Sequence, residues 1–162
     1  MRKIDCETKP EMVKFLLKFV PIRKTNAVLE AGSRKNKVWY ENVKVKKRYE
    51  CEILDGKDYF KWNIKVDWVV GNPPHRDKPG GKNLLWDWIV KTTEIAQKGF
   101  AFLFNHRFIN LLTPKRLEFL KQKGFYIQKI VIVNDKRWFG RYWFVVFQKK
   151  KKDFIRWHLK SF

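Results

Sequence analysis

The chain has 162 residues, of which 44% are hydrophobic and 17% are aromatic. That composition supports one well-buried domain spanning 1–162, and the length excludes two ordinary domains. Lysine and arginine number 37 against 16 aspartate and glutamate residues, so the net charge is +21. This charge is far beyond what solubility needs and predicts a polyanionic partner, with DNA as the expected one. A lysine-coated protein without such a partner is the alternative.

The cysteines and histidines do not form a metal-binding pattern. Cys6 and Cys51 make no CxxC pair and no ligand spacing with His75, His106 or His158, so we expect reduced thiols and no metal. The first residues lack an apolar signal core, and no apolar run approaches the length that crosses a membrane. We therefore expect a cytoplasmic protein with no membrane partner.

The first predicted element is an N-terminal helix. Residues 8–11, Thr-Lys-Pro-Glu, have the spacing of a capping box, and apolar residues recur behind them until Pro21. Taken by itself, this segment is an ordinary amphipathic helix.

Two short strands with carboxylates near their ends follow this helix. Residues 27–33 predict a strand that runs into a tight turn, with Glu30 near the strand end and Gly32 in the turn. Residues 49–53 predict a second strand, with Glu52 close to its end. An acid at the end of the second strand of a Rossmann-type unit is well placed to accept both hydroxyls of a ribose. A solvent-facing charge is the alternative for Glu52.

A predicted buried strand at 66–70 leads into the most distinctive loop of the chain, Gly-Asn-Pro-Pro-His at 71–75. The two prolines fix φ and donate no N–H, which leaves a rigid arc of acceptors: the side-chain oxygen of Asn72 and the carbonyls of Asn72 and Pro73. Such an arc fits both hydrogens of a planar amino group and makes its nitrogen a better nucleophile. A simple turn is the alternative for the tripeptide alone.

This Asn-Pro-Pro loop after a hydrophobic strand resembles the catalytic motif of the S-adenosylmethionine-dependent amino-methyltransferases. That family methylates the exocyclic amine of adenine or cytosine. Its Asn side chain and first Pro carbonyl bind the amine, and the residue after the second Pro stacks on the extruded base. The resemblance therefore assigns catalysis to Asn72, Pro73, Pro74 and His75, with histidine in place of the family's usual aromatic residue. The implied cofactor is S-adenosylmethionine.

The resemblance also implies a cofactor site upstream of the loop. Its predicted members are Thr8, Pro10, Glu30, Gly32, Glu52, Asp58 and Tyr59. In the family, an acid followed by an aromatic residue binds the adenine of the cofactor: the acid binds its amine, and the aromatic ring covers its ring. Asp58 with Tyr59 or Phe60 matches this pair. The chain keeps one glycine of the family's turn and continues with Arg34 and Lys35, so we expect one of these cations to pair with the cofactor carboxylate.

The rest of the chain predicts the second half of an open α/β sheet. The predicted elements are a helix at 83–98 ended by Gly99, an apolar strand at 100–104, a helix from Thr113-Pro114 to Gly124, and final strands at 127–133 and 143–148. Too few residues separate the last two strands for a crossover helix, so they must form an antiparallel hairpin. Together the elements predict a Rossmann-like methyltransferase fold, with a mostly parallel sheet and helices on both faces.

Two basic loops are candidates for contact with nucleic acid. Residues 76–82 are polar and glycine-containing, which fits either a segment that closes over phosphates through Arg76 and Lys78 or a solvated linker. The loop at 134–142 mixes cations with aromatic residues at an exposed tip. We expect it to hold phosphates and meet a flipped base through Arg137, Trp138, Phe139 and Arg141. The basic tail at 149–162 extends the charged surface.

The sequence thus predicts transfer of a methyl group to adenine N6 in DNA. The same chemistry on RNA is one alternative, because no feature identifies a reader of the 2′-hydroxyl. A catalytically inactive nucleic-acid-binding descendant is the other, and the altered glycine turn and His75 favour it. A homodimer would match a palindromic target.

Overall fold

The structure is a computed structural model that describes residues 8–74, 84–137, 140–150 and 156–161. Its helices are α1 (Pro10–Leu17), α2 (Val38–Asn42), α3 (Leu84–Ile95), α4 (Phe108–Leu111) and α5 (Pro114–Gln122), with 3₁₀ turns η1 (Ile53–Asp55) and η2 (Tyr59–Lys61). Its strands are β1 (Ala27–Ala31), β2 (Lys47–Cys51), β3 (Val66–Gly71), β4 (Ala96–Asn105), β5 (Tyr126–Asn134), β6 (Tyr142–Gln148) and β7 (Arg156–Ser161). They form one sheet in the order β2-β1-β3-β4-β6-β5-β7.

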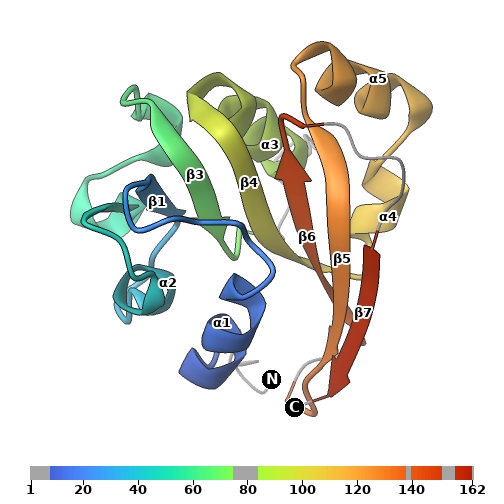
Figure 1. Ribbon diagram of the computed structural model, residues 1–162, viewed down its shortest axis with the longest axis horizontal. Coiled ribbons are helices and arrows are strands. Elements are labelled where there is room, and N and C mark those ends of the chain that lie inside the picture. The colour runs from blue at the N-terminus through green and yellow to red at the C-terminus, as the bar shows by residue number, and fades with distance from the viewer. Residues whose placement is uncertain (1–7, 75–83, 138–139, 151–155, 162) are drawn as a thin grey trace.

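The sheet is covered on both faces, as Figure 1 shows. One core lies between the sheet and the pair α1 and α2, and the other lies between the sheet and α3, α4 and α5. The central strand β4 serves both cores: Phe100, Phe102 and Phe104 face the second, while Ala101 and Leu103 face the first. Alternate residues of a strand point to opposite faces, so a strand buried on both sides must be apolar throughout.

The predicted antiparallel hairpin is confirmed, but it does not end the sheet. β6 pairs antiparallel with both β4 and β5, whereas β7 pairs parallel with β5 on its outer side. Residues 156–161, expected to be part of a basic tail, therefore form an edge strand. The sequence carries a signal for it, because apolar Trp157 and Leu159 alternate with polar residues.

The predicted helix at 83–98 is too long. α3 ends at Ile95, and β4 already begins at Ala96, so Gly99 lies within the strand. A Cβ at Gly99 would lie 2.4 Å from both the Phe147 oxygen and the Trp68 ring. This glycine is therefore required by the close approach of neighbouring groups, and it does not end a helix.

The capping box predicted at residues 8–11 is also wrong. α1 begins at Pro10 with Lys9 as its N-cap, and no side chain caps it. Pro10 occupies the first helical position, where its missing N–H costs nothing. Thr8, the expected cap, instead accepts a hydrogen bond from the side-chain nitrogen of Asn72, at 3.4 Å.

The topology gathers the predicted site residues at one edge of the sheet. β1, β2, β3 and β4 are parallel neighbours, so the segments after their last residues share one edge. The turn at Gly32, the acid Glu52 and the loop at Asn72 follow β1, β2 and β3 there. Ligands of open α/β sheets bind at this carboxyl edge.

Candidate active site

A large cavity opens at the carboxyl edge, beside the ends of β1, β2 and β3. It measures about 820 Å³, within the range typical of cofactor sites. Its lining comprises Gly32, Arg34, Lys35, Cys51, Glu52, Ile53, Leu54, Lys57, Asp58, Tyr59, Phe60, Asn72, Pro74, Leu84 and Trp88. Six of the predicted cofactor and catalytic residues, drawn from four segments of the chain, thus come together around one cavity: Gly32, Glu52, Asp58, Tyr59, Asn72 and Pro74.

The turn after β1 is built from backbone contacts to β2. Gly32 and Ser33 both donate their N–H groups to the Cys51 carbonyl, each at 3.0 Å. Gly32 has φ of 73°, and Arg34 has φ of 52°, which is a left-handed conformation uncommon for a residue with a side chain. Arg34 therefore takes a backbone shape that glycine adopts freely, and it adds a cation to the cavity.

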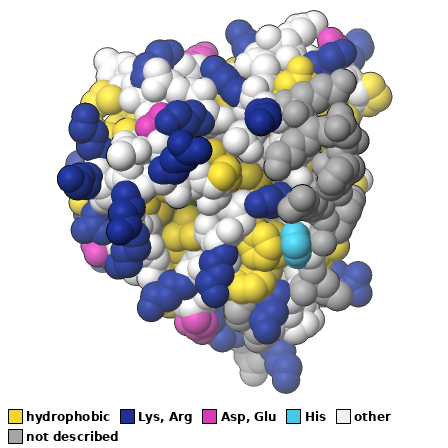
Figure 2. All heavy atoms as spheres, viewed as in Figure 1, with side chains coloured by type: hydrophobic (Ala, Val, Ile, Leu, Met, Phe, Trp, Pro, Cys, Tyr) yellow, Lys and Arg dark blue, Asp and Glu magenta, His cyan; other side chains and the backbone are white. Residues whose placement is uncertain are grey.

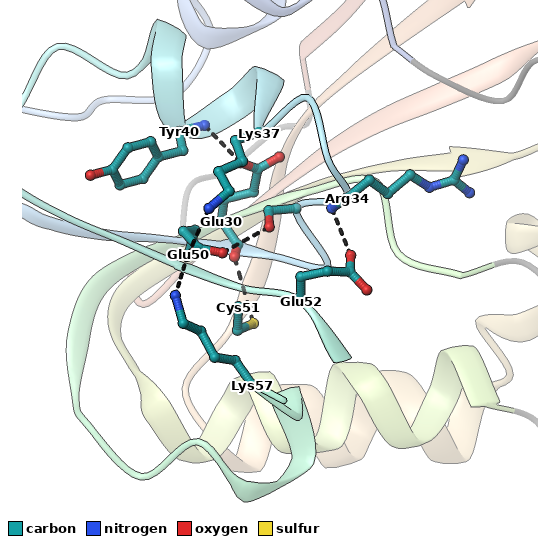
Figure 3. Close-up of polar contacts among 9 residues, drawn as sticks. Glu30, Arg34, Lys37, Tyr40, Glu50, Cys51, Glu52 and Lys57 are labelled. Atoms are coloured by element: carbon teal, nitrogen blue, oxygen red, sulfur yellow. Dashed lines mark hydrogen bonds and ion pairs between the residues drawn. The ribbon is translucent and has the colours of Figure 1, made fainter. Parts of the chain in front are cut away.

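Glu30 is buried at the end of β1, with only 2% of its surface exposed. Its carboxylate accepts hydrogen bonds from the backbone N–H of Tyr40, at 2.9 Å, and of Trp39, at 3.3 Å. Burial raises its pKa to about 7, against the lowering effect of these two hydrogen bonds. Figure 3 shows the Tyr40 contact, which ties β1 to the start of α2.

Glu52 follows β2 and shapes the cavity wall. One carboxylate oxygen accepts from the Arg34 N–H at 2.7 Å, and the other accepts from the Leu54 N–H at 3.2 Å. A carboxylate offers about four acceptor positions, so these two bonds leave capacity for a ligand. In Figure 3 the Arg34 side chain points away from Glu52, although its backbone is bound to it.

Glu50, one residue before the end of β2, carries the charged cluster beside this wall. Lys37 and Lys57 both pair with its carboxylate, and Figure 3 shows them approaching from opposite sides. Ser33 also donates to it, at 3.0 Å. Burial alone would raise the pKa of Glu50, but the hydrogen bonds from Lys57, Ser33 and Lys37 together lower it by more. The net shift of the pKa is therefore downward, which favours the carboxylate anion.

Asp58 and the two aromatic residues after it have different surroundings. Asp58 caps η2 by accepting from the Phe60 N–H at 2.9 Å. Tyr59 is buried, stacks on Trp88 with ring centroids 4.2 Å apart, and bonds through its hydroxyl to Thr92. Burial raises the pKa of this hydroxyl. Tyr59 thus forms the cavity floor, whereas Phe60 is half-buried at its wall.

Asn72 stands between the large cavity and a smaller one of about 20 Å³. The smaller cavity is also lined by Thr8, Glu30, Gly32 and Arg34. Of the predicted loop, Pro73 is buried and Pro74 lines the large cavity. Thr8 lines the smaller cavity, whereas Pro10 begins α1 and lines neither cavity.

The loop between β5 and β6 lies at the same edge of the sheet. A Cβ at Gly140 would lie 3.1 Å from His106, which follows β4, so the loop reaches that strand end. Arg137 directs its guanidinium at the buried carboxylate of Asp135, at 2.9 Å, which fixes the loop internally. Arg141 is exposed. The predicted residues His75, Arg76, Lys78, Trp138 and Phe139 lie outside the described part of the chain.

Sequence reasoning missed part of the cavity wall. Ile53 and Leu54 line it and are 67% and 82% exposed, which is unusual for such large apolar side chains. Trp88 also lines it, through a ring that packs over Gly32. The signal in the sequence is the apolar pair directly after Glu52, although without coordinates it resembles the end of a strand.

The sequence matches no protein-family model and no curated protein. The structure, however, resembles many solved ones. A protein of Listeria monocytogenes, described as a class I S-adenosylmethionine-dependent methyltransferase, superimposes with a TM-score of 0.70 at 14% identity, over 99% of this chain and 67% of that one. The chain has the class I methyltransferase fold.

Two further structures with this methyltransferase fold have different substrates in their names. The 23S rRNA methyltransferase ErmE gives a TM-score of 0.65 at 14% identity, over 90% of this chain and 70% of that one. Magnesium protoporphyrin IX methyltransferase of Synechocystis, with bound S-adenosylmethionine, gives 0.63 at 12% identity, over 86% and 77%. Identity at this level shows the fold, and a fold alone does not define a substrate.

The lining residues fit S-adenosylmethionine. Carboxylates of Glu52 and Asp58 suit hydroxyl and amine donors, and the apolar side chains of Ile53, Leu54 and Phe60 suit a base. Arg34 and Lys35 supply cations for a carboxylate. Among the described residues, no group of three or more His, Cys, Asp and Glu could hold a metal, and no helix is long and apolar enough to cross a membrane.

Proposed function

We propose that the protein is an S-adenosylmethionine-dependent methyltransferase that modifies the exocyclic N6 amine of adenine in DNA. The observation that carries this proposal is the position of Asn72. Asn72 directly follows β3, and its side chain lines the cavity that fits the cofactor and contacts Thr8. This position beside the proposed cofactor site supports Asn72 as the acceptor for the amine.

The chemistry required of the chain is orientation and polarisation. When bound, S-adenosylmethionine supplies an electrophilic methyl group. Asn72 and the Pro73 carbonyl are the acceptors for the two hydrogens of the amine, and they stabilise the positive charge that develops on the amino group as its nitrogen attacks. The prolines keep the acceptors fixed, because neither can rotate about φ or donate an N–H. The buried Pro73 anchors the loop against the protein.

The net charge of +21 supports a nucleic-acid substrate. Figure 2 shows lysine and arginine side chains spread over the face covered by α1 and α2, with few acidic ones between them. Such a surface attracts phosphates of DNA and RNA alike. The test must therefore offer both polymers to the protein.

The experiment is incubation with isotope-labelled S-adenosylmethionine and either unmethylated DNA or RNA, followed by mass spectrometry of the nucleosides. We expect labelled N6-methyladenine in the DNA pool. Label in RNA alone would reassign the substrate. Tight DNA binding with no label in either pool would instead identify a catalytically silent binder.

The variant Asn72→Ala tests the assignment of the acceptor. It should lose methyl transfer by at least about a hundredfold, comparable to removing one preorganised hydrogen-bonding group from an active site, and should retain cofactor binding. Asn110→Ala is the control, because Asn110 is exposed and lines neither of the two site cavities. Wild-type rates in Asn72→Ala would overturn the assignment.

A further inference from the structure

A second cavity lies at the opposite, amino-terminal edge of the parallel strands. It measures about 380 Å³ and is lined by Pro21, Arg23, Asn26, Trp68, Gln97, Lys98, Gln148, Lys149 and Lys150. Four of these residues are cations and none is an acid, although Lys98 pairs with the neighbouring Asp67. The active-site cavity, in contrast, is lined by both cations and carboxylates. The chemistry of the second cavity therefore favours an anion.

The cations are attached to ordered backbone from three separate segments. The Arg23 N–H donates to the Asn26 side chain at 2.8 Å, and the Lys149 N–H donates to the Lys98 carbonyl at 2.9 Å. The Lys150 carbonyl accepts from the Gln128 side chain at 2.7 Å. These bonds hold the segments around the cavity, so the cations converge there in the folded state only.

The floor of the cavity is polar and buried. Asn26 is 2% exposed and donates to Asp67, which also accepts from the Ala27 N–H and pairs with Lys98 at 2.9 Å. Trp68 is 1% exposed, and its indole N–H has no acceptor among the described residues. The floor is thus rigid and closed, and the groups that a ligand can reach are the cations around it.

We propose that this cavity binds a phosphate of the nucleic-acid strand whose base occupies the active site. Positive charge continues beyond the cavity, because exposed Lys24 adjoins Arg23 and accepts a backbone hydrogen bond from exposed Lys46. A nucleic acid carries many phosphates and can contact both the cavity and the lysines beyond it, whereas a single small anion can contact the cavity alone.

The cavity and the active site open at opposite edges of the sheet. Trp68 in the cavity floor and Asn72 are four positions apart, which is roughly 13 Å through the sheet at about 3.3 Å per residue. A strand that fills both sites must run over the surface, so it spans more than about four phosphate steps of about 3.4 Å. The cavity is thus an anchor several nucleotides from the target base, and its link to that base rests on the proposed function.

The test is DNA binding by fluorescence anisotropy across a series of salt concentrations, without cofactor. The double variant Arg23→Gln/Lys150→Gln removes two exposed cavity cations, and Lys14→Gln/Lys115→Gln removes two exposed cations from α1 and α5. The cavity variant should flatten the slope of log affinity against log salt by about 1.8 and weaken binding more than tenfold near 0.1 M salt. The control pair should change the slope by less than half as much.

Three outcomes would overturn the proposal. Equal losses in both variants would show that the charge acts diffusely, and no loss in either would show that the cavity is not used. Displacement of DNA from the wild type alone by micromolar inorganic triphosphate would identify a small-anion site. Because the assay contains no cofactor, it can succeed even where methyl transfer is absent, which separates its failure from failure of the proposed function.

Discussion

The buried carboxyl of Glu30 predicts a specific dependence of stability on pH. Its pKa rises from an ordinary 4.5 to about 7 in the folded protein, chiefly because burial disfavours the charged form. The nearby carboxylates of Glu50 and Glu41 raise it further, while hydrogen bonds from Trp39 and Tyr40 lower it. The folded state therefore binds this proton more tightly than the unfolded state does.

The sign follows from proton linkage. A carboxyl with a raised folded pKa stabilises the fold in acid, and that stabilisation disappears as the pH rises from 4.5 through about 7. The full shift corresponds to about 3 kcal/mol, of which about 2 kcal/mol falls between roughly pH 5.5 and pH 8. Over that interval the lowered pKa values of Glu50, Asp67 and Asp135 contribute little, because those groups are ionised in both states.

The measurement is urea unfolding, followed by tryptophan fluorescence, at several pH values for wild type and Glu30→Gln. Glutamine does not titrate, so the variant should lack the loss of about 2 kcal/mol that Glu30 causes in the wild type. The variant replaces one side-chain oxygen that accepts from a backbone N–H, and this loss gives only an offset that is independent of pH. Glu11→Gln is the control, since Glu11 is an exposed acid of α1. Parallel pH profiles for wild type and Glu30→Gln would refute the reasoning.

Three further predictions concern the cavity and the core. Glu52→Ala and Asp58→Ala should each weaken the binding of S-adenosylmethionine measured by calorimetry, and an unchanged affinity would remove that residue from the site. Glu52→Ala should also lower the free energy of unfolding by about 1–2 kcal/mol, because it loses two hydrogen bonds from backbone N–H groups. Arg34→Gly should relieve the left-handed backbone and raise the melting temperature, while cofactor affinity falls about tenfold as a charge-assisted contact is lost. Equal affinity would leave Lys35 as the cation for the carboxylate. Gly99→Ala should cost more than about 2 kcal/mol in urea unfolding, because its Cβ would overlap the Phe147 backbone, and a smaller loss would mean that β4 and β6 separate readily.

Local patterns in the sequence were sufficient for most of the fold. Strands alternate with helices as the sequence predicts, Glu30 lies near the end of β1, Glu52 follows β2, and the Asn-Pro-Pro loop follows β3. These features succeed because strand ends and rigid turns are set by residues adjacent in the chain. The hairpin succeeds for a related reason, since a short connection leaves only one geometry.

Errors occurred where a distant contact competes with a local preference. Thr8 has the spacing of a helix cap, yet its hydroxyl bonds to Asn72, which lies far along the chain. Gly99 resembles a helix end, but it is there because Trp68 and the Phe147 backbone approach it closely. Neither partner can be identified from the neighbouring sequence, because packing across the sheet brings them together.

The chemical groups available to this protein can be read from its sequence: a rigid loop of hydrogen-bond acceptors at 72–74, carboxylates near the ends of two strands and a large positive charge. Tertiary structure decided how those groups are used. Folding placed Tyr59 in the cavity floor, exposed Ile53 and Leu54 at its wall, and collected Arg23, Lys98, Lys149 and Lys150 from three segments around a second cavity. Sequence fixes which groups a chain carries, but only packing sets which of them meet and which remain accessible to a ligand.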